Sequence, residues 1–112
     1  MNIITKESGN ITIIELKGNV LGGPDASALN DILHQLTGKK KKNIVVDLSG
    51  VQSMNSSGLT MLIGALTTIR NAGGEMKIAA PSKKIESILV ITKLATVFEI
   101  HPTLRKAISS FT

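Results

Sequence analysis

Hydrophobic positions change their period several times along the chain, from two to three or four and back. Short Ile/Thr-rich runs at 2–7 and 11–17 have a period of two, and Ser8-Gly9-Asn10 separates them. This pattern predicts a β-hairpin at the start of the chain. Residues 18–24 form a Gly-rich loop, and apolar residues then recur every three to four positions, which predicts an amphipathic helix over about 24–37.

The remainder of the chain continues the alternation of strand and helix. An apolar run closed by Asp47 covers 43–48 and is typical of a strand buried on both faces. We expect Ser49-Gly50 to end this strand and 51–54 to be a short connection. The elements predicted after it are a helix over about 56–72, a strand over 76–80, a helix opened by Pro81-Ser82 with Leu94 facing inward, a strand over 97–100 and a helix opened by Pro102. The order ββαβαβαβα predicts a single α/β domain over 1–112, with a mostly parallel sheet, the N-terminal hairpin and about four helices.

The composition excludes several classes of function. The chain has no Cys, which rules out disulfides, thiolate metal sites and cysteine nucleophiles, and its two histidines, His34 and His101, cannot form a multi-histidine metal site. With Phe98 and Phe111 as the only aromatic residues, a base-stacking nucleic-acid surface is not expected. No apolar stretch could span a bilayer, and the N-terminus lacks a signal-peptide pattern. We therefore expect a cytoplasmic protein with no metal, no cofactor, no membrane span and no direct DNA binding.

The net charge of +5 comes mostly from one place. Lys39–Lys42 supply four of the five net positive charges. A run of four lysines between a predicted helix and strand is most simply a solvated loop. A less favoured alternative is a nucleotide or lipid site that these lysines form together with Gly22-Gly23-Pro24.

The most informative segment is Asn55-Ser56-Ser57, at a predicted strand-to-helix junction. Asn is a favoured N-cap residue, and its side chain can accept a hydrogen bond from the backbone of Ser57 or Gly58. A helix cap with small residues is therefore the structural interpretation, and the residues alone favour it. In the functional interpretation, a phosphate on Ser56, with Ser57 as the second candidate, is stabilised by the helix N-terminus. It would add about −1.5 to −2 of charge, enough to block a partner without refolding the domain.

Other properties of this segment argue for binding rather than catalysis. A serine nucleophile needs an oriented base, and Gly-x-Ser-x-Gly is absent because Met54 and Gly58 flank Ser56 at those positions. Met61 falls outside the apolar stripe of its helix, so we expect it to be exposed beside Ser56 as a flexible contact residue. Gly64, in the middle of that helix, is expected to allow close packing of helix against sheet.

Asp47-Leu48-Ser49-Gly50-Val51, followed by Met54-Asn55-Ser56-Ser57-Gly58-Leu59, resembles the signature of STAS domains, in particular of bacterial anti-sigma factor antagonists. The resemblance continues through Gly18, Gly73-Gly74 and Lys93-Leu94 and implies a STAS-like fold. It also implies a non-enzymatic protein in a partner-switching circuit. The unphosphorylated form of such a protein binds an anti-sigma factor that is itself a serine kinase. Phosphorylation ends this complex, and a phosphatase restores it.

The serine phosphorylated in that family corresponds to Ser56. The resemblance implies partner contacts at Leu21, Gly22, Gly23, Met54, Asn55, Ser56, Ser57, Gly58 and Met61. The sequence departs from the family pattern in two places. Asn55 stands where the family usually has Asp. The loop before the first helix, from Gly18 to Asp25, is one residue longer than the corresponding loop of the family, which usually contains Gly-Glu-Leu-Asp. The alternative function is a constitutive STAS module that scaffolds a signalling complex and is never phosphorylated.

Overall fold

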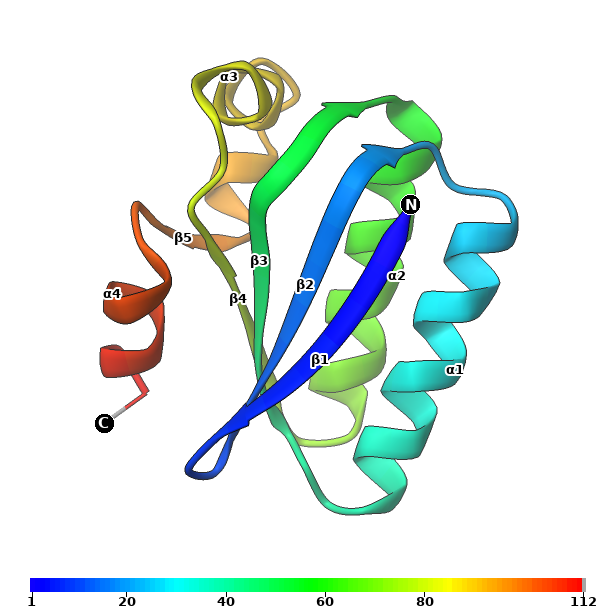
Figure 1. The fold of residues 1–112 in the computed structure, drawn as a ribbon, viewed down its shortest axis with the longest axis vertical. Helices are drawn as coiled ribbons and strands as arrows, with labels where there is room; N and C mark the ends of the chain where they lie inside the picture. The colour runs from blue at the N-terminus through cyan, green and yellow to red at the C-terminus, as the bar shows by residue number, and fades with distance from the viewer. Residues whose placement is uncertain (112) are drawn as a thin grey trace.

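The computed structural model describes residues 1–111 and contains a five-stranded sheet and four α-helices (Figure 1). The elements are β1 (Asn2–Ser8), β2 (Ile11–Val20), α1 (Pro24–Gly38), β3 (Asn43–Met54), α2 (Ser56–Asn71), β4 (Glu75–Ala79), α3 (Lys83–Ile91), a 3₁₀ helix (Leu94–Thr96), β5 (Glu99–His101) and α4 (Leu104–Ser109). This order confirms the predicted succession of strands and helices and adds the 3₁₀ helix before the last strand. Thr112, the last residue of the predicted domain 1–112, lies outside the described residues.

The sheet has the strand order β1-β2-β3-β4-β5 and is mostly parallel, as predicted. β1 pairs antiparallel with β2, from Asn2 opposite Lys17 to Ser8 opposite Ile11. The predicted hairpin is therefore confirmed, and Gly9 adopts the positive φ of 61° that its tight turn requires. The remaining pairs, β2 to β5, are parallel because helices on the faces of the sheet connect their strands.

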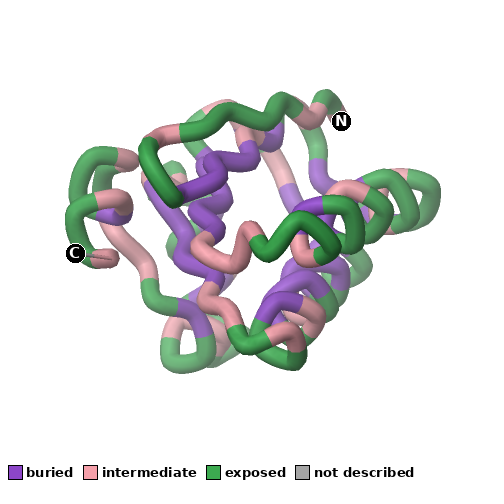
Figure 2. The backbone as a smooth tube through the Cα atoms, turned by 90° about the horizontal axis from the view of Figure 1, so that it is seen from below, coloured by how far each residue is buried: buried purple, intermediate pink, exposed green. Residues whose placement is uncertain are grey.

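Helices cover both faces of the sheet. α1 and α2 pack on one face, where α3 joins the same main core, and α4 packs on the other face (Figure 1). Alternate residues of β3 point to opposite faces of the sheet. Ile44 and Val46 belong to the main core, whereas Val45 packs with Ala107 of α4. All three β3 side chains are fully buried, which confirms the prediction of a strand covered on both faces. Figure 2 shows the same arrangement, with buried backbone at the centre and along the inward sides of the helices.

Strands β2 and β3 are longer than predicted. Instead of ending at residues 17 and 48, β2 continues to Val20 and β3 continues to Met54. After irregularities in register, Gly18 pairs with Val51 and Val20 pairs with Met54. The predicted break at Ser49-Gly50 was therefore wrong, since a bulge lets the strand bend without losing its partner.

The predicted boundaries after α3 also needed correction. Leu94, expected inside the third helix, lies in the 3₁₀ helix, because the chain turns at Lys93 with a φ of 63°. Strand β5 covers only Glu99–His101 rather than 97–100. α4 begins at Leu104 after a Thr103 cap, two residues beyond Pro102. The sequence therefore indicated the five strands and four α-helices, missed the 3₁₀ helix and misplaced several element ends by a few residues.

The four lysines Lys39–Lys42 follow α1 in the loop that leads to β3, as predicted, and Lys39 and Lys40 are exposed whereas Lys41 and Lys42 are half-buried. One of them, Lys41, forms an ion pair with Glu7 at 2.8 Å. Gly22-Gly23-Pro24 lies at the opposite end of α1, about 22 Å away for a helix of this length. The distance contradicts a joint nucleotide or lipid site made from the glycine loop and the lysine run.

A buried lysine fixes α4 against the sheet. Lys77 of β4 donates to the backbone carbonyl of Ser110 at 3.1 Å and contacts the Ser110 hydroxyl at 2.8 Å. Its ammonium also forms an ion pair with Glu99 at 2.8 Å and lies 4.3 Å from the centre of the Phe111 ring. These contacts compensate for the burial of the charge and anchor the last helix.

Acidification is expected to weaken this anchoring through Glu99. Hydrogen bonds from Lys77 and then from His101 lower the pKa of Glu99 from 4.5 to about 2. Because the folded pKa is the lower one, the carboxylate stabilises the fold above pH 4.5 and loses this effect as pH falls through about 2. Glu99→Gln should therefore reduce the dependence of the unfolding free energy on pH between about 5 and 2, measured by urea denaturation. Glu86→Gln, an exposed change in α3, is the control, and an unchanged slope for Glu99→Gln would contradict the prediction.

Candidate functional site

The candidate site lies where β3 passes into α2, at the carboxyl end of the parallel strands. Asn55 separates the two elements in an extended conformation, and its side-chain oxygen accepts the backbone N–H of Gly58 at 2.8 Å. The backbone N–H of Asn55 donates in turn to the carbonyl oxygen of Val20 at 3.3 Å. The predicted N-cap is thus confirmed, and the start of α2 is fixed to the end of β2.

Removal of this cap should be measurable as a loss of stability. Asn55→Ala is expected to lower the free energy of unfolding by about 1 kcal/mol, because an unpaired N–H then remains at the first turn of α2. Asn55→Asp keeps the acceptor oxygen and adds a negative charge at the positive end of the helix, so it should retain wild-type stability. Chemical denaturation of the three proteins tests this, and equal stability of the Ala variant would show that the cap contributes nothing.

Ser56 and Ser57 begin α2, and both side chains are exposed. The carbonyl of Ser56 accepts a hydrogen bond from the hydroxyl of Thr60 at 3.0 Å, whereas its own hydroxyl points to no protein partner among residues 1–111. The first turn of α2 contains no acidic residue. A phosphate here would therefore lie at the positive end of a helix dipole without a carboxylate in the same turn.

The loop between β2 and α1 lies directly against the first turn of α2. Gly22 has a φ of 80°, and a Cβ atom at this position would come within 2.8 Å of the Cβ of Ser57. Gly58 is even more tightly enclosed, since a Cβ there would collide with the carbonyl oxygen of Val20. The tertiary structure therefore brings the Gly22-Gly23 loop together with the two serines, which lie more than thirty residues later in the chain.

The predicted partner residues divide into an exposed and a buried group. Leu21 is half exposed, and the exposed group also includes Gly23, Asn55, Ser56 and Ser57. The buried residues are Gly22, Met54, Gly58 and Met61. Their role in binding stays a prediction, and the buried ones can act only by shaping the surface.

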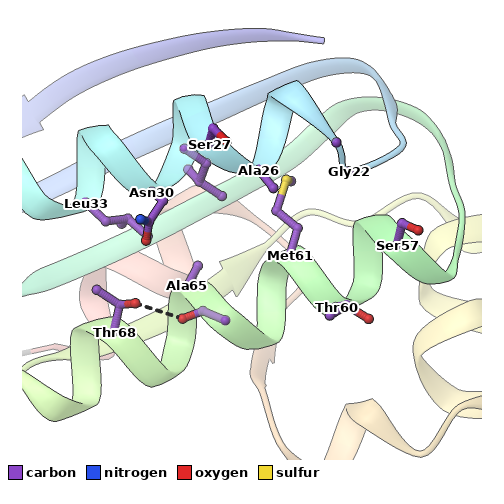
Figure 3. Close-up of a pocket in the computed structure, with 13 residues that line it drawn as sticks. Gly22, Ala26, Ser27, Asn30, Leu33, Ser57, Thr60, Met61, Ala65 and Thr68 are labelled. Atoms are coloured by element: carbon purple, nitrogen blue, oxygen red, sulfur yellow. Dashed lines mark hydrogen bonds between the residues drawn. The ribbon is translucent and has the colours of Figure 1, made fainter.

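The expectation that Met61 is exposed was wrong, because only 7% of its surface is accessible. Its side chain points from α2 toward α1 (Figure 3). A helical wheel identifies the side of α2 that faces the sheet, but here a second side is covered by a neighbouring helix. The expectation for Gly64 was also wrong, because a Cβ atom at this position would have no atom within 4 Å, so this glycine does not serve close packing against the sheet.

A groove of about 430 Å³ separates α1 from α2 (Figure 3). We call it the α1–α2 groove, and its lining is Gly22, Gly23, Ala26, Ser27, Leu29, Asn30, Leu33, Ser57, Thr60, Met61, Gly64, Ala65 and Thr68. One end is therefore formed by the glycine loop and Ser57. The sequence analysis did not predict this groove. Gly64, in the middle of α2, was the one residue that could have indicated it.

The chemistry available at Ser56 is limited. His101 lies on β5, hydrogen-bonded to Glu99 at 2.7 Å, and His34 is exposed in α1. Neither imidazole is hydrogen-bonded to Ser56, so the arrangement gives no support to a nucleophilic serine. Within residues 1–111, no group of three or more His, Cys, Asp or Glu could hold a metal ion. No helix of that described part is long and apolar enough to cross a membrane.

Comparison with known proteins gives a match to one protein family. The sequence profile of the STAS domain matches residues 2–107. A Thermotoga maritima protein assigned as an anti-sigma factor antagonist is 28% identical over 76 residues, which cover 68% of this chain and 67% of that protein.

Solved structures share the fold. A crystal structure assigned to the same class, also from Thermotoga maritima, superposes with a TM-score of 0.86 at 22% identity, covering 96% of this chain and 92% of the other. The Bacillus cell fate determinant SpoIIAA in its phosphorylated form gives a TM-score of 0.74 at 14% identity, covering 99% and 100% of the two chains. At these identities the structural likeness establishes a common fold.

Proposed function

The chain belongs to the STAS domain family, and we propose that it acts as an anti-sigma factor antagonist, switched by phosphorylation of Ser56. The observation that carries the proposal is an exposed serine at the first position of α2, directly after a capping residue, within a fold shared with antagonists of this kind. The partner is an anti-sigma factor with serine kinase activity, and the protein itself performs no catalysis. We place it in the cytoplasm, where such a circuit operates.

The arrangement supports this switch on electrostatic grounds. Transfer of the γ-phosphoryl group of ATP to the Ser56 hydroxyl releases ADP and a proton and leaves a charge of about −1.5 to −2 on the surface. The free N–H groups of the first turn of α2 stabilise that charge in the unbound protein. A partner that covers Ser56 would have to desolvate it, so binding is lost while the fold is kept.

Phosphorylation is expected at Ser56 alone. Each anti-sigma factor kinase encoded in the same genome would be purified, incubated with the protein and ATP, and the product analysed by mass spectrometry. We expect one phosphate per chain on Ser56, its loss in Ser56→Ala and its retention in Ser57→Ala, which separates the two exposed serines. A phosphate that persists in Ser56→Ala would contradict the assignment. Binding without any phosphorylation would favour a constitutive scaffold instead.

A further inference from the structure

Gly64 occupies a position in α2 where a glycine has no local justification. It lies inside a 16-residue helix, where glycine is less favourable than alanine. Its φ is not positive, and a Cβ atom there would meet nothing within 4 Å. The missing side chain therefore serves neither the backbone nor internal packing. Its effect is to keep the middle of the α1–α2 groove open.

The α1–α2 groove carries no charge. None of its lining residues is Lys, Arg, Asp, Glu or His, although 19% of the chain is charged. Leu29, Leu33 and Ala65 are buried at its floor, and small polar side chains form its rim. The rim hydroxyls of Thr60 and Thr68 already donate to carbonyl oxygens of α2, at 3.0 Å each. The groove is thus matched to an uncharged, apolar occupant.

The shape of the groove fits one side of a helix. Its α2 lining runs from Ser57 through Thr60, Met61, Gly64 and Ala65 to Thr68, which is about three turns or 16 Å. On the facing side, Ala26, Asn30 and Leu33 of α1 recur at the same spacing. Small residues on both sides let another backbone approach closely, and an amphipathic helix presents apolar residues at this repeat.

One end of the groove is continuous with the candidate phosphorylation site. Ser57, Gly22 and Gly23 form that end, and Ser56 precedes Ser57 at the start of the same helix. Ser56 itself is not part of the lining, so a phosphate on it would lie beside this end of the groove, one residue before Ser57.

From this geometry we infer that the α1–α2 groove receives the apolar side of a helix from the anti-sigma factor, with one end of that helix at Ser56. The inference rests on the proposed function and adds the surface and the kind of segment that bind. It explains how one phosphate can end a complex, because the charge is introduced beside one end of an uncharged groove.

Filling the groove tests the inference without unfolding the protein. Gly64→Ala and Gly64→Leu both improve helix propensity and enter open space, so both should have melting temperatures equal to or above that of the wild type. In calorimetric titration with the purified anti-sigma factor kinase, Gly64→Leu should bind at least about tenfold more weakly than the wild type, and Gly64→Ala should lie between them. Ala28→Leu adds comparable bulk at an exposed position of α1 outside the groove and should bind normally.

The outcomes distinguish a failure of this inference from a failure of the proposed function. If Gly64→Leu binds like the wild type while Ser56→Glu does not, the groove is not the docking surface and the proposed function stands. If the wild type binds none of the kinases, the proposed function fails, and the inference fails with it. If Gly64→Leu converts a wild-type dimer to a monomer in sedimentation, the occupant is a second copy of this chain, which also overturns the inference.

Discussion

Ser56→Glu is expected to bind the anti-sigma factor about 100-fold more weakly than the wild type, a loss of about 2.7 kcal/mol. The substitution places a negative charge on an exposed residue that the partner would cover, and the interface would have to bury that charge without a designed counter-ion. Ser56→Ala removes only a hydroxyl that has no hydrogen-bond partner within residues 1–111, so it should bind within about threefold of the wild type. Titration calorimetry of the three proteins measures the difference.

The Ser56→Glu variant should be at least as stable as the wild type. A carboxylate in the first turn of α2 interacts favourably with the helix dipole, by about 0.3–1 kcal/mol. A weaker complex of Ser56→Glu therefore cannot be attributed to unfolding if its melting temperature is at least that of the wild type. Asn71→Glu adds the same charge at the far end of α2 and should leave affinity unchanged. Equal affinities of Ser56→Glu and Ser56→Ala would contradict the proposed switch.

Two glycines of α2 should respond oppositely to the same substitution. Gly58→Ala is expected to destabilise the fold by about 3 kcal/mol, because the new Cβ collides with the carbonyl oxygen of Val20. That carbonyl cannot easily move away, since it accepts the backbone N–H of Asn55. Gly64→Ala is expected to stabilise the fold by about 1 kcal/mol, because it gains helix propensity in open space.

Guanidinium chloride denaturation of both variants provides the measurement. Each protein is a control for the other, since helix and substitution are the same and only the surroundings differ. Destabilisation by both substitutions would mean that the space beside Gly64 is not open in solution. Little effect at Gly58 would mean that β2 is not held against the start of α2.

The sequence was sufficient wherever the controlling interactions are local. The hairpin depends on a turn at Ser8-Gly9-Asn10 and on a period of two beside it, and both are visible in a few consecutive residues. The cap at Asn55 depends on a contact only three residues ahead. The resemblance to STAS domains was carried by a contiguous motif, which is why the family and fold could be predicted together.

Boundaries and exposure were predicted less well, because they depend on distant partners. The extension of β3 beyond Ser49 requires the paired residues of β2, which lie about thirty positions earlier. Lys77 is buried because Ser110 and Phe111, more than thirty residues later, cover and neutralise it. No periodicity around Lys77 contains that information.

The sequence by itself determined the order of the elements, the helix start at Asn55 and the serine pair that follows it, because each is encoded by neighbours in the chain. Only the tertiary structure decided that Met61 is buried, that Gly64 borders open space and that Gly22 touches Ser57. These three facts have one physical cause. α1 lies beside α2 on the same face of the sheet, and the space left between two helices depends on side chains that belong to both (Figure 3).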